Sequence, residues 1–401
     1  MSCINKRVSP QIGKITIIAF TIFFCTIYVC PSANAQNAEQ TEIAFAASMR
    51  TFLNQYEEDK LHDYAFQASQ RKSAGSPSRI PSNPPSSANE SDSIPFSKSD
   101  WSDFGITPIS SDSSTSINTI AKEPNGNITI SASVKSSITF SVATDTTLVI
   151  AGEKRQEFTQ SSLDKHTITA TNTNGRIEVL NDTLDNEYND SEPEQISSNA
   201  ALPITSSLTN GAAATTEFGT NSAGLNYITA MKYADKWSQK AVSTGDGTQD
   251  VMNPAFPIYD NNCTNFVSQI LYTGGLPLRG GSLLQAHDTS VWTWRLTGSS
   301  KASRTWSAAN YNYTYMKDHS NSFTPDSNPM HAWQGSIIYA DWQNNGELDH
   351  AMFVVGYIAN DLHVSPIIDQ MTVPRHDYMF TASVIQSPAA TTYKTLLYKY
   401  E

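Results

Sequence analysis

Alternating apolar residues between Ile128 and Val179 constrain the fold of this chain more than any other feature. They occupy every second position in successive runs: Ile128, Ile130, Ala132 and Val134; Ile138, Phe140 and Val142; Ile168 and Ala170 after His166; and, beyond Asn174-Gly175, Ile177 and Val179. A period of two is typical of strands with one buried face, and Asn-Gly is typical of a tight hairpin turn. The stretch therefore predicts antiparallel strands.

A helix is expected ahead of these strands. Its apolar residues recur at helical spacing: Phe45, Met49, Phe52, Leu53 and Tyr56. They predict an amphipathic helix over roughly residues 38–70, within an N-terminal segment at 36–72. Packed on strands from the stretch 101–182, this helix would complete a small α+β domain. Because the domain has no cluster of catalytic residue types, we expect it to play an accessory role.

Two segments of biased composition divide the chain. Residues 73–100 are rich in Ser, Pro and Asn, and residues 183–222 run from an acidic stretch into a Ser/Thr-rich one. Each has too little apolar surface to fold, so both are expected to be linkers. A C-terminal domain is predicted at 223–401. Its first helix has one apolar face, made of Tyr227, Ala230, Met231, Ala234 and Trp237.

Residues 1–35 have the pattern of a signal peptide. Basic residues precede an apolar run from Ile15 to Cys30, and Ala33-Asn-Ala35 supplies the small residues of a cleavage site. About 16 apolar residues are fewer than the ~20 that a spanning helix needs, so an uncleaved anchor is the less favoured alternative. We expect cleavage after Ala35 and a secreted, extracytoplasmic product with no stable membrane span.

The charge balance bears on the class of partner. The chain has 26 basic and 38 acidic residues, a net charge of −12. Because the signal peptide contains only positive charges, its removal makes the product still more acidic. Nucleic acid is therefore not an expected partner.

Cys263 is the only cysteine outside the predicted signal peptide. A single thiol in an exported protein cannot form an intramolecular disulfide, so it is either packed as a small side chain or reactive. The apolar residues after it predict a helix that Gly274-Gly275 ends, with Asn262 or Asp260 as its cap. At a first helical turn, the amide groups and the helix dipole favour a thiolate and can stabilise an oxyanion.

His350 is the candidate general base. It leads the apolar run Ala351–Val355, which is too short for a helix and typical of a central strand. A histidine at the rim of a sheet can reach a helix N-terminus and accept the proton of a thiol nucleophile. The alternative is a polar residue that only ends a strand, since a turn-like sequence precedes it.

The third catalytic residue depends on strand register. If residues 360–361 form a two-residue turn, counting back along the hairpin places Asp369 on the face of His350, where it could orient the imidazole. A bulge at Pro366 would bring Gln370 onto that face instead. We expect Asp369 in this role, with Gln370 as the alternative.

The other histidines and the tryptophans are weaker candidates. The hairpin count puts His363 at the end far from His350. The isolated histidines share no metal-ligand spacing with another His or Cys, so no zinc site is predicted; they are His287, His331 and His376. Three tryptophans can line a substrate groove, although buried packing is the commoner role; they are Trp292, Trp294 and Trp306.

The C-terminal half contains a set of short motifs. They are Leu225-Asn-Tyr, Ala230-Met-Lys-Tyr-Ala234 and Trp237; Asn253-Pro and Phe256; Asn262-Cys-Thr-Asn-Phe-Val-Ser-Gln269 and Gly274-Gly275; Trp292 and Trp306; Gly335-Ser-Ile-Ile338; Asp341-Trp342; and Asp349-His350. In this set the stretch from Leu225 to about Tyr378 resembles the putative amidase domain of exported bacterial proteins, a relative of papain-like murein peptidases and amidases. The block around Cys263 is the specific part of the resemblance.

This resemblance implies an α+β fold whose C-terminal domain is papain-like, with the nucleophile's helix packed on an antiparallel sheet. It also implies Cys263 as nucleophile and His350 as general base in the hydrolysis of amide or peptide bonds, with peptidoglycan stem peptides as one possible substrate. No cofactor or metal is expected.

The sequence departs from the family at three positions. Asn262 replaces the usual Asp, Ser336 replaces the Asp of a Gly-Asp pair, and Met371 stands where the family tends to have a histidine. A methionine cannot accept the imidazole N–H strongly. Either Asp369 or Gln370 substitutes for it, or activity is weak or lost.

We therefore predict a secreted thiol-dependent hydrolase that acts through an acyl-enzyme on Cys263. Two alternatives remain open from the sequence. One is a catalytically inactive member of the fold that binds a cell-wall or other surface partner. The other is an acyltransferase that uses the same pair of residues.

Overall fold

The computed structural model describes residues 45–59, 61, 101–173, 176–184, 195–197, 223–246, 251–386 and 391–400. The predicted signal peptide and the predicted linker at 73–100 lie outside these ranges, as does most of the linker at 183–222. The chain divides into a unit of residues 1–47 and a unit of residues 48–401, and the second carries the fold described below. No helix in the described ranges combines the length and the apolar character that crossing a membrane would require.

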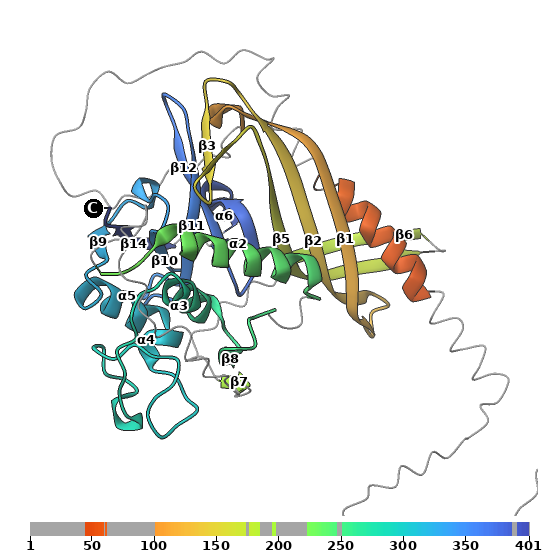
Figure 1. Cartoon of the computed structure of the whole chain (residues 1–401). Helices are drawn as coiled ribbons and strands as arrows, with labels where there is room; N and C mark the ends of the chain where they lie inside the picture. Colours follow the sequence, from red (N-terminus) through yellow and green to blue (C-terminus); the bar gives the residue numbers. More distant parts are fainter. Residues whose placement is uncertain are drawn as a thin grey trace, which may run out of the picture. The chain divides into compact units, whose positions relative to one another are not determined.

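Twelve strands of the described chain form one sheet, with antiparallel pairing throughout (Figure 1). Its main path has the order β1-β2-β5-β13-β12-β11-β10-β14-β9. These strands are β1 (Ile106–Lys122), β2 (Ile128–Val142), β5 (Glu157–Thr173), β9 (Phe323–Asp326), β10 (Ile337–Asp341), β11 (His350–Ala359), β12 (Val364–Gln370), β13 (Arg375–Met379) and β14 (Thr392–Tyr398). The branches are β3 (Thr147–Ile150), β4 (Glu153–Arg155) and β6 (Arg176–Leu184).

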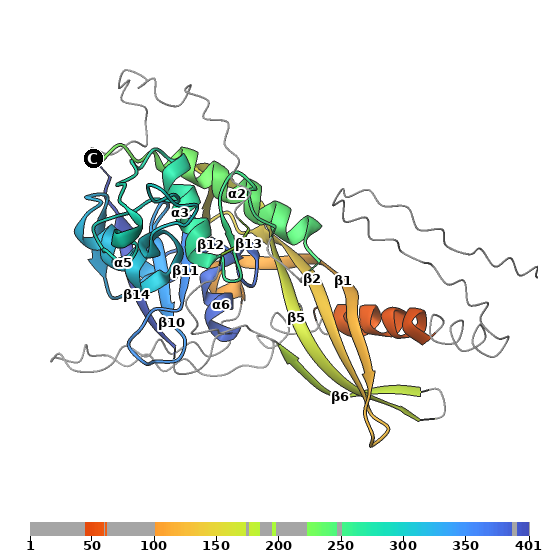
Figure 2. The same cartoon turned by 90° about the horizontal axis from the view of Figure 1, so that it is seen from below.

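The remaining elements are mostly helical. They are α2 (Tyr227–Thr244), α3 (Cys263–Thr273), α4 (Arg304–Ser307), α5 (Ala309–Asp318) and α6 (Phe380–Gln386); the 3-10 turns η2 (Trp101–Phe104), η4 (Leu283–Gln285) and η5 (Pro329–His331); and the small pair β7 (Gln195–Ser197) and β8 (Ile258–Tyr259). Figure 2 shows α2 and α3 on one face of the sheet and α6 on the other. Helices on an antiparallel sheet confirm the predicted α+β class.

The alternating stretch forms long strands, as predicted. Ile130 of β2 pairs with Ile168 of β5, and both side chains are fully buried. A helix over residues 45–59 packs on this part of the sheet, where Met49 and Leu53 are fully buried. The backbone N–H of Thr115 in β1 donates to Asn54 Oδ1 of this helix at 2.7 Å. Burial of its apolar stripe, rather than helix propensity alone, stabilises this segment.

The strand-rich stretch and the C-terminal domain share one sheet. β13 pairs with β5, with Arg375 opposite Ser162 and His376 opposite Ser161. Phe140 of β2 and Ile337 of β10 belong to the same buried apolar cluster. The stretch 101–182 therefore continues the sheet of the C-terminal domain, although Ile130, Ile168 and Leu53 are buried outside the shared cluster.

Gly356 lies where the register of the central strands shifts. β3 runs beside the end of β11, with Ile150 opposite Gly356. A Cβ on Gly356 would collide with the backbone oxygen of Val149. The ladder between β11 and β12 shifts by one residue between Val354 and Gly356. Such a bulge moves every residue beyond it to the other face of the sheet.

Candidate functional site

Cys263 is the first residue of α3, as predicted. The helix ends where Gly274 donates its N–H to the carbonyl oxygen of Ile270, and Gly275 then takes a φ of +102°. A left-handed residue at this position is the usual end of a helix, and glycine adopts it without strain. The thiol thus lies where the helix dipole is positive.

Asn262 is the N-cap residue of this helix, one of the two predicted, but its side chain forms no capping hydrogen bond. The Cys263 N–H donates to Asn261 Oδ1 at 3.3 Å. Asn262 Oδ1 instead accepts the N–H of Tyr259 at 3.0 Å, which folds the entry loop back. An oxyanion bound by the Cys263 amide would therefore have to displace the Asn261 side chain.

The polar residues of the Cys263 motif hold α3 in place. Asn265 Oδ1 accepts from the indole of Trp306 at 2.8 Å, and Gln269 Nε2 donates to the same oxygen at 3.1 Å. Ser268 Oγ accepts from Trp292 and from Asn312. Buried polar groups need such partners. Trp292 and Trp306 are therefore buried packing residues, the commoner role considered for them; Trp294 is buried too, although its indole nitrogen has no partner among the described residues.

The Cys263 thiol lies beside the start of β11. Its sulfur lies 3.8 Å from the backbone carbonyl oxygen of Asp349 and 3.6 Å from Thr264 Oγ1. Nearby, the N–H of Asn262 donates to Thr372 Oγ1, just beyond β12. Cys263, the candidate nucleophile, therefore lies at the end of the central strands where β11 begins and β12 ends. Only 2% of the Cys263 surface is exposed.

The fold brings the backbone of Asp349-His350 to the thiol but does not bond the imidazole to it. His350 is fully buried, and among the described residues neither of its ring nitrogens has a hydrogen-bond partner. Trp342 stacks on the ring at a centroid distance of 4.3 Å. This stacked indole covers the imidazole, a role for Trp342 that the sequence did not reveal.

The surroundings of His350 keep it neutral. Its pKa is lowered to about 3: burial is the largest cause, the Gln370 side chain raises the pKa in part, and the charge of Arg375 also lowers it. Gln370 nevertheless forms no hydrogen bond of ordinary length and angle with the imidazole. Its Oε1 atom has no hydrogen-bond partner among the described residues. Gln370 and Arg375 pair across β12 and β13, so they share the face toward which the ring points.

Asp369 does not orient His350, and the register explains this correction. Ala359 pairs with Val364, so the turn is longer than the expected two residues, and the bulge in β11 then sets Phe353 opposite Asp369. Continuing this register places Gln370, not Asp369, opposite Met352 and on the face of His350. The alternative weighed for this position is thus the one the geometry favours, although the bulge lies in β11 rather than at Pro366.

Asp369 belongs to a second cluster on the opposite face. It accepts the N–H of Asp377 at 2.8 Å and lies 3.6 Å from His376 Nδ1. Burial lowers the pKa of His376, but Asp369 and the other nearby carboxylates raise it by more, to about 9. Ser238 of α2 also bonds the His376 ring, at 2.9 Å. No local pattern in the sequence predicts this cluster, because its residues come from β12, β13 and α2, which meet only in the folded protein.

The structure also locates three other residues that the sequence analysis singled out: His363, Met371 and Ser336. His363 lies in the turn after β11, packed on Phe104 and far along the hairpin from His350. Met371 is fully buried and offers no strong acceptor. Ser336 Oγ accepts the N–H of Tyr398 at 3.1 Å, so this departure from the family pattern is used in joining β14 to the sheet.

Comparison with known proteins agrees with the C-terminal assignment. Residues 224–395 match the model of the family described as "Putative amidase domain". This range contains Cys263, His350, Gln370 and Asp369. The resemblance noted in the motifs is thereby confirmed for the C-terminal domain, and the activity class that the family description names is amide hydrolysis.

One curated relative matches part of the chain. It is described as "Uncharacterized protein YhbB" of Bacillus subtilis (strain 168) and is 28% identical over 145 residues. The match covers 36% of this chain and 40% of the relative, so each protein extends well beyond it. No solved structure matches the chain.

Proposed function

We propose that the C-terminal domain hydrolyses amide or peptide bonds through an acyl-enzyme on Cys263. The observation that carries this proposal is the place of the thiol at the first residue of α3, 3.8 Å from the carbonyl that precedes His350. Cys263 attacks the substrate carbonyl, and His350 takes the thiol proton and returns it to the leaving amine. Gln370 orients the imidazole.

This chemistry requires the site to open. In the resting arrangement His350 is neutral, covered by Trp342 and not bonded to the thiol. α3 lies on the α2 face of the sheet, whereas the His350 ring points to the opposite face. Substrate binding would therefore have to displace the indole and swing the imidazole around the start of β11 to reach Cys263, where a thiolate stabilises the imidazolium. Catalytic contacts that are loose in a free enzyme often tighten only in its complex with substrate.

We propose extracytoplasmic peptides as substrates, with peptidoglycan stem peptides as the first to test. The support is the signal-peptide pattern of residues 1–35 together with the amidase description of residues 224–395. The secreted location is part of the same proposal.

The test combines thiol labelling with product analysis. Alkylation of Cys263 by iodoacetamide, followed by mass spectrometry from pH 5 to 9, should occur well below pH 8 and slow at least tenfold in His350→Gln. Cys263→Ser should abolish release of amines from peptidoglycan fragments. His331→Gln is the matched control, because His331 is an exposed histidine paired with Asp326. Release of amines that His350→Gln leaves unchanged would remove the catalytic pair.

A second candidate is a binding module of the same fold without activity. It is favoured by the burial of Cys263 and His350 and by the occupation of the Cys263 amide by Asn261. Such a module would retain peptidoglycan fragments in a pull-down without releasing amines, and Cys263→Ser would leave that retention unchanged.

A further inference from the structure

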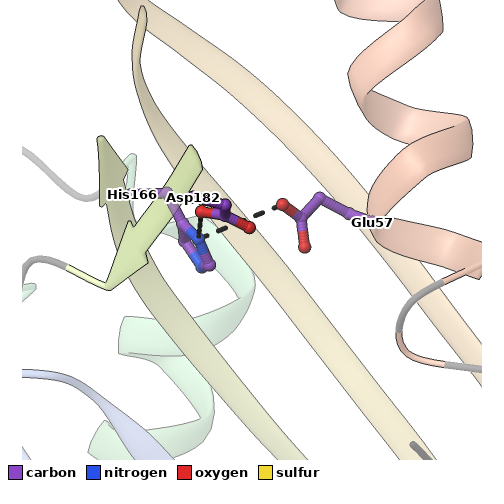
Figure 3. A group of neighbouring side chains, drawn as sticks. All are labelled: Glu57, His166 and Asp182. Carbon is purple, nitrogen blue, oxygen red and sulfur yellow. Dashed lines mark hydrogen bonds and ion pairs between the residues drawn. The ribbon is translucent and has the colours of Figure 1, made fainter. Parts of the chain in front are cut away.

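A buried trio of ligand-type side chains lies apart from Cys263, on the long strands. Glu57 comes from the helix at 45–59, His166 from β5 and Asp182 from β6 (Figure 3). Asp182 is paired with Ile168, two residues along β5 from His166, so both side chains point to the same face of the sheet. Glu57 reaches them from the helix that covers this face.

We infer that Glu57, His166 and Asp182 bind a divalent transition metal ion of the Zn²⁺ type. One imidazole nitrogen and two carboxylate oxygens are ligands that Zn²⁺ accepts, whereas the harder Ca²⁺ and Mg²⁺ prefer oxygen alone. No motif spacing announces the site, because its ligands come from three separate elements.

The distances suit such an ion. His166 Nδ1 lies 2.8 Å from Asp182 Oδ1 and 4.0 Å from Glu57 Oε1. One ligand atom of each residue lies within 4.8 Å of the others. Ligands at about 2.0–2.1 Å in a tetrahedron stand about 3.3 Å apart. To bind an ion, His166 Nδ1 and Asp182 Oδ1 have to separate by about 0.5 Å, and the Glu57 carboxylate has to approach His166 by about 0.7 Å.

The charges of the trio favour a cation. Two carboxylates face one imidazole, so the three side chains keep a net negative charge even when His166 is protonated. A metal ion bound there would replace the proton on His166 Nδ1.

A cavity supplies room for the rest of the coordination shell. It has a volume of about 360 Å³ and is lined by all three residues together with Ser136, Gln160 and others. Three protein ligands with the fourth position left to water is the arrangement of open zinc sites. Water in the cavity can complete the shell.

The comparable trio on the other face is a poorer site. It consists of Asp235, His376 and Asp377. Arg155 lies 3.4 Å from Asp377, and Ser238 and Asp369 already engage His376 Nδ1. A positive charge beside one ligand opposes a cation there. The Glu57 site would, in addition, fasten the N-terminal helix to β5 and β6.

The experiment titrates the full chain, stripped of metal, with Zn²⁺ in competition with a chromophoric chelator at pH 7.5. One equivalent should bind, and Glu57→Gln and Asp182→Asn should each weaken it at least thirtyfold. Asp326→Asn is the matched control, since it alters the exposed His331 pair, and should change the affinity less than threefold. Thermal unfolding in chelator verifies that each variant is folded.

Amide hydrogen exchange gives a second measurement. Zn²⁺ should slow exchange in residues 48–59 of the wild type and not of Glu57→Gln, because only the wild type can fasten the helix through the ion. The inference is overturned if the wild type binds neither Zn²⁺ nor Mn²⁺ more tightly than Glu57→Gln does.

Discussion

His350 and His376 lie on nearby strands of one sheet, yet their surroundings are opposite. His350 shares its face with Gln370 and Arg375, and its pKa falls to about 3. His376 faces α2 among Asp369, Asp377 and Asp235, and its pKa rises to about 9. Both rings are buried, so neighbouring charge decides the difference. Burial alone therefore does not fix the state of a histidine.

The largest expected effect concerns the two arginine–aspartate pairs on these faces. Arg375 Nη2 lies 2.6 Å from Asp164 Oδ1 and both are buried, whereas Arg155 is 32% exposed and lies 3.4 Å from Asp377. Arg375→Met leaves Asp164 buried and uncompensated, so we expect it to lower the free energy of unfolding by about 3–5 kcal/mol. Arg155→Met should cost about 1 kcal/mol or less.

Urea unfolding of the two variants checks this prediction. Arg375→Met should also raise the pKa of His350, because Arg375 is one of the groups that lower it. NMR titration of the His350 ring measures that change, with Arg155→Met as the control. Equal losses of stability in the two variants would mean that the two faces do not differ in this way.

The next effect is the dependence of stability on pH. The pKa of His350 in the folded state is below the ordinary 6.5, so its contribution to stability is present above pH 6.5 and is lost as the pH falls toward 3. The pKa of His376 is raised, so its contribution is complete below pH 6.5 and is lost as the pH rises through 9. Each group contributes a slope of roughly 1.4 kcal/mol per pH unit within its window.

Unfolding free energies of His350→Gln and His376→Gln across pH separate the two contributions. The acid slope should flatten only in His350→Gln, and the slope between pH 6.5 and 9 only in His376→Gln. If both substitutions flatten the same part of the plot of unfolding free energy against pH, the two histidines do not differ in this way.

Local signals in the sequence predicted the nucleophile's helix. The apolar face after Cys263 and the Gly274-Gly275 end are contained in a few consecutive residues. The alternation of β2 likewise identified a strand without knowledge of its partners. Such patterns reflect burial of one face, which short stretches encode.

Register and long-range clusters were not predictable in the same way. The partner of His350 depends on the length of the turn after Ala359 and on the bulge before Gly356, and an error of one residue exchanged Asp369 for Gln370. The bulge occurs where β3 approaches Gly356. Glu57, His166 and Asp182 meet only when the N-terminal helix packs on β5 and β6.

The smallest expected effect distinguishes Gln370 from Asp369 directly. Gln370→Leu removes the amide that we propose orients the imidazole in the open site, and a hydrogen bond of about 1 kcal/mol missing there should slow amide hydrolysis about fivefold. Asp369→Asn alters the opposite face and should change that rate less than twofold, while it lowers the pKa of His376. If Asp369→Asn loses more activity than Gln370→Leu, Asp369 is the orienting residue after all. In the register described above, the Asp369 side chain faces away from the imidazole and could not cause that loss.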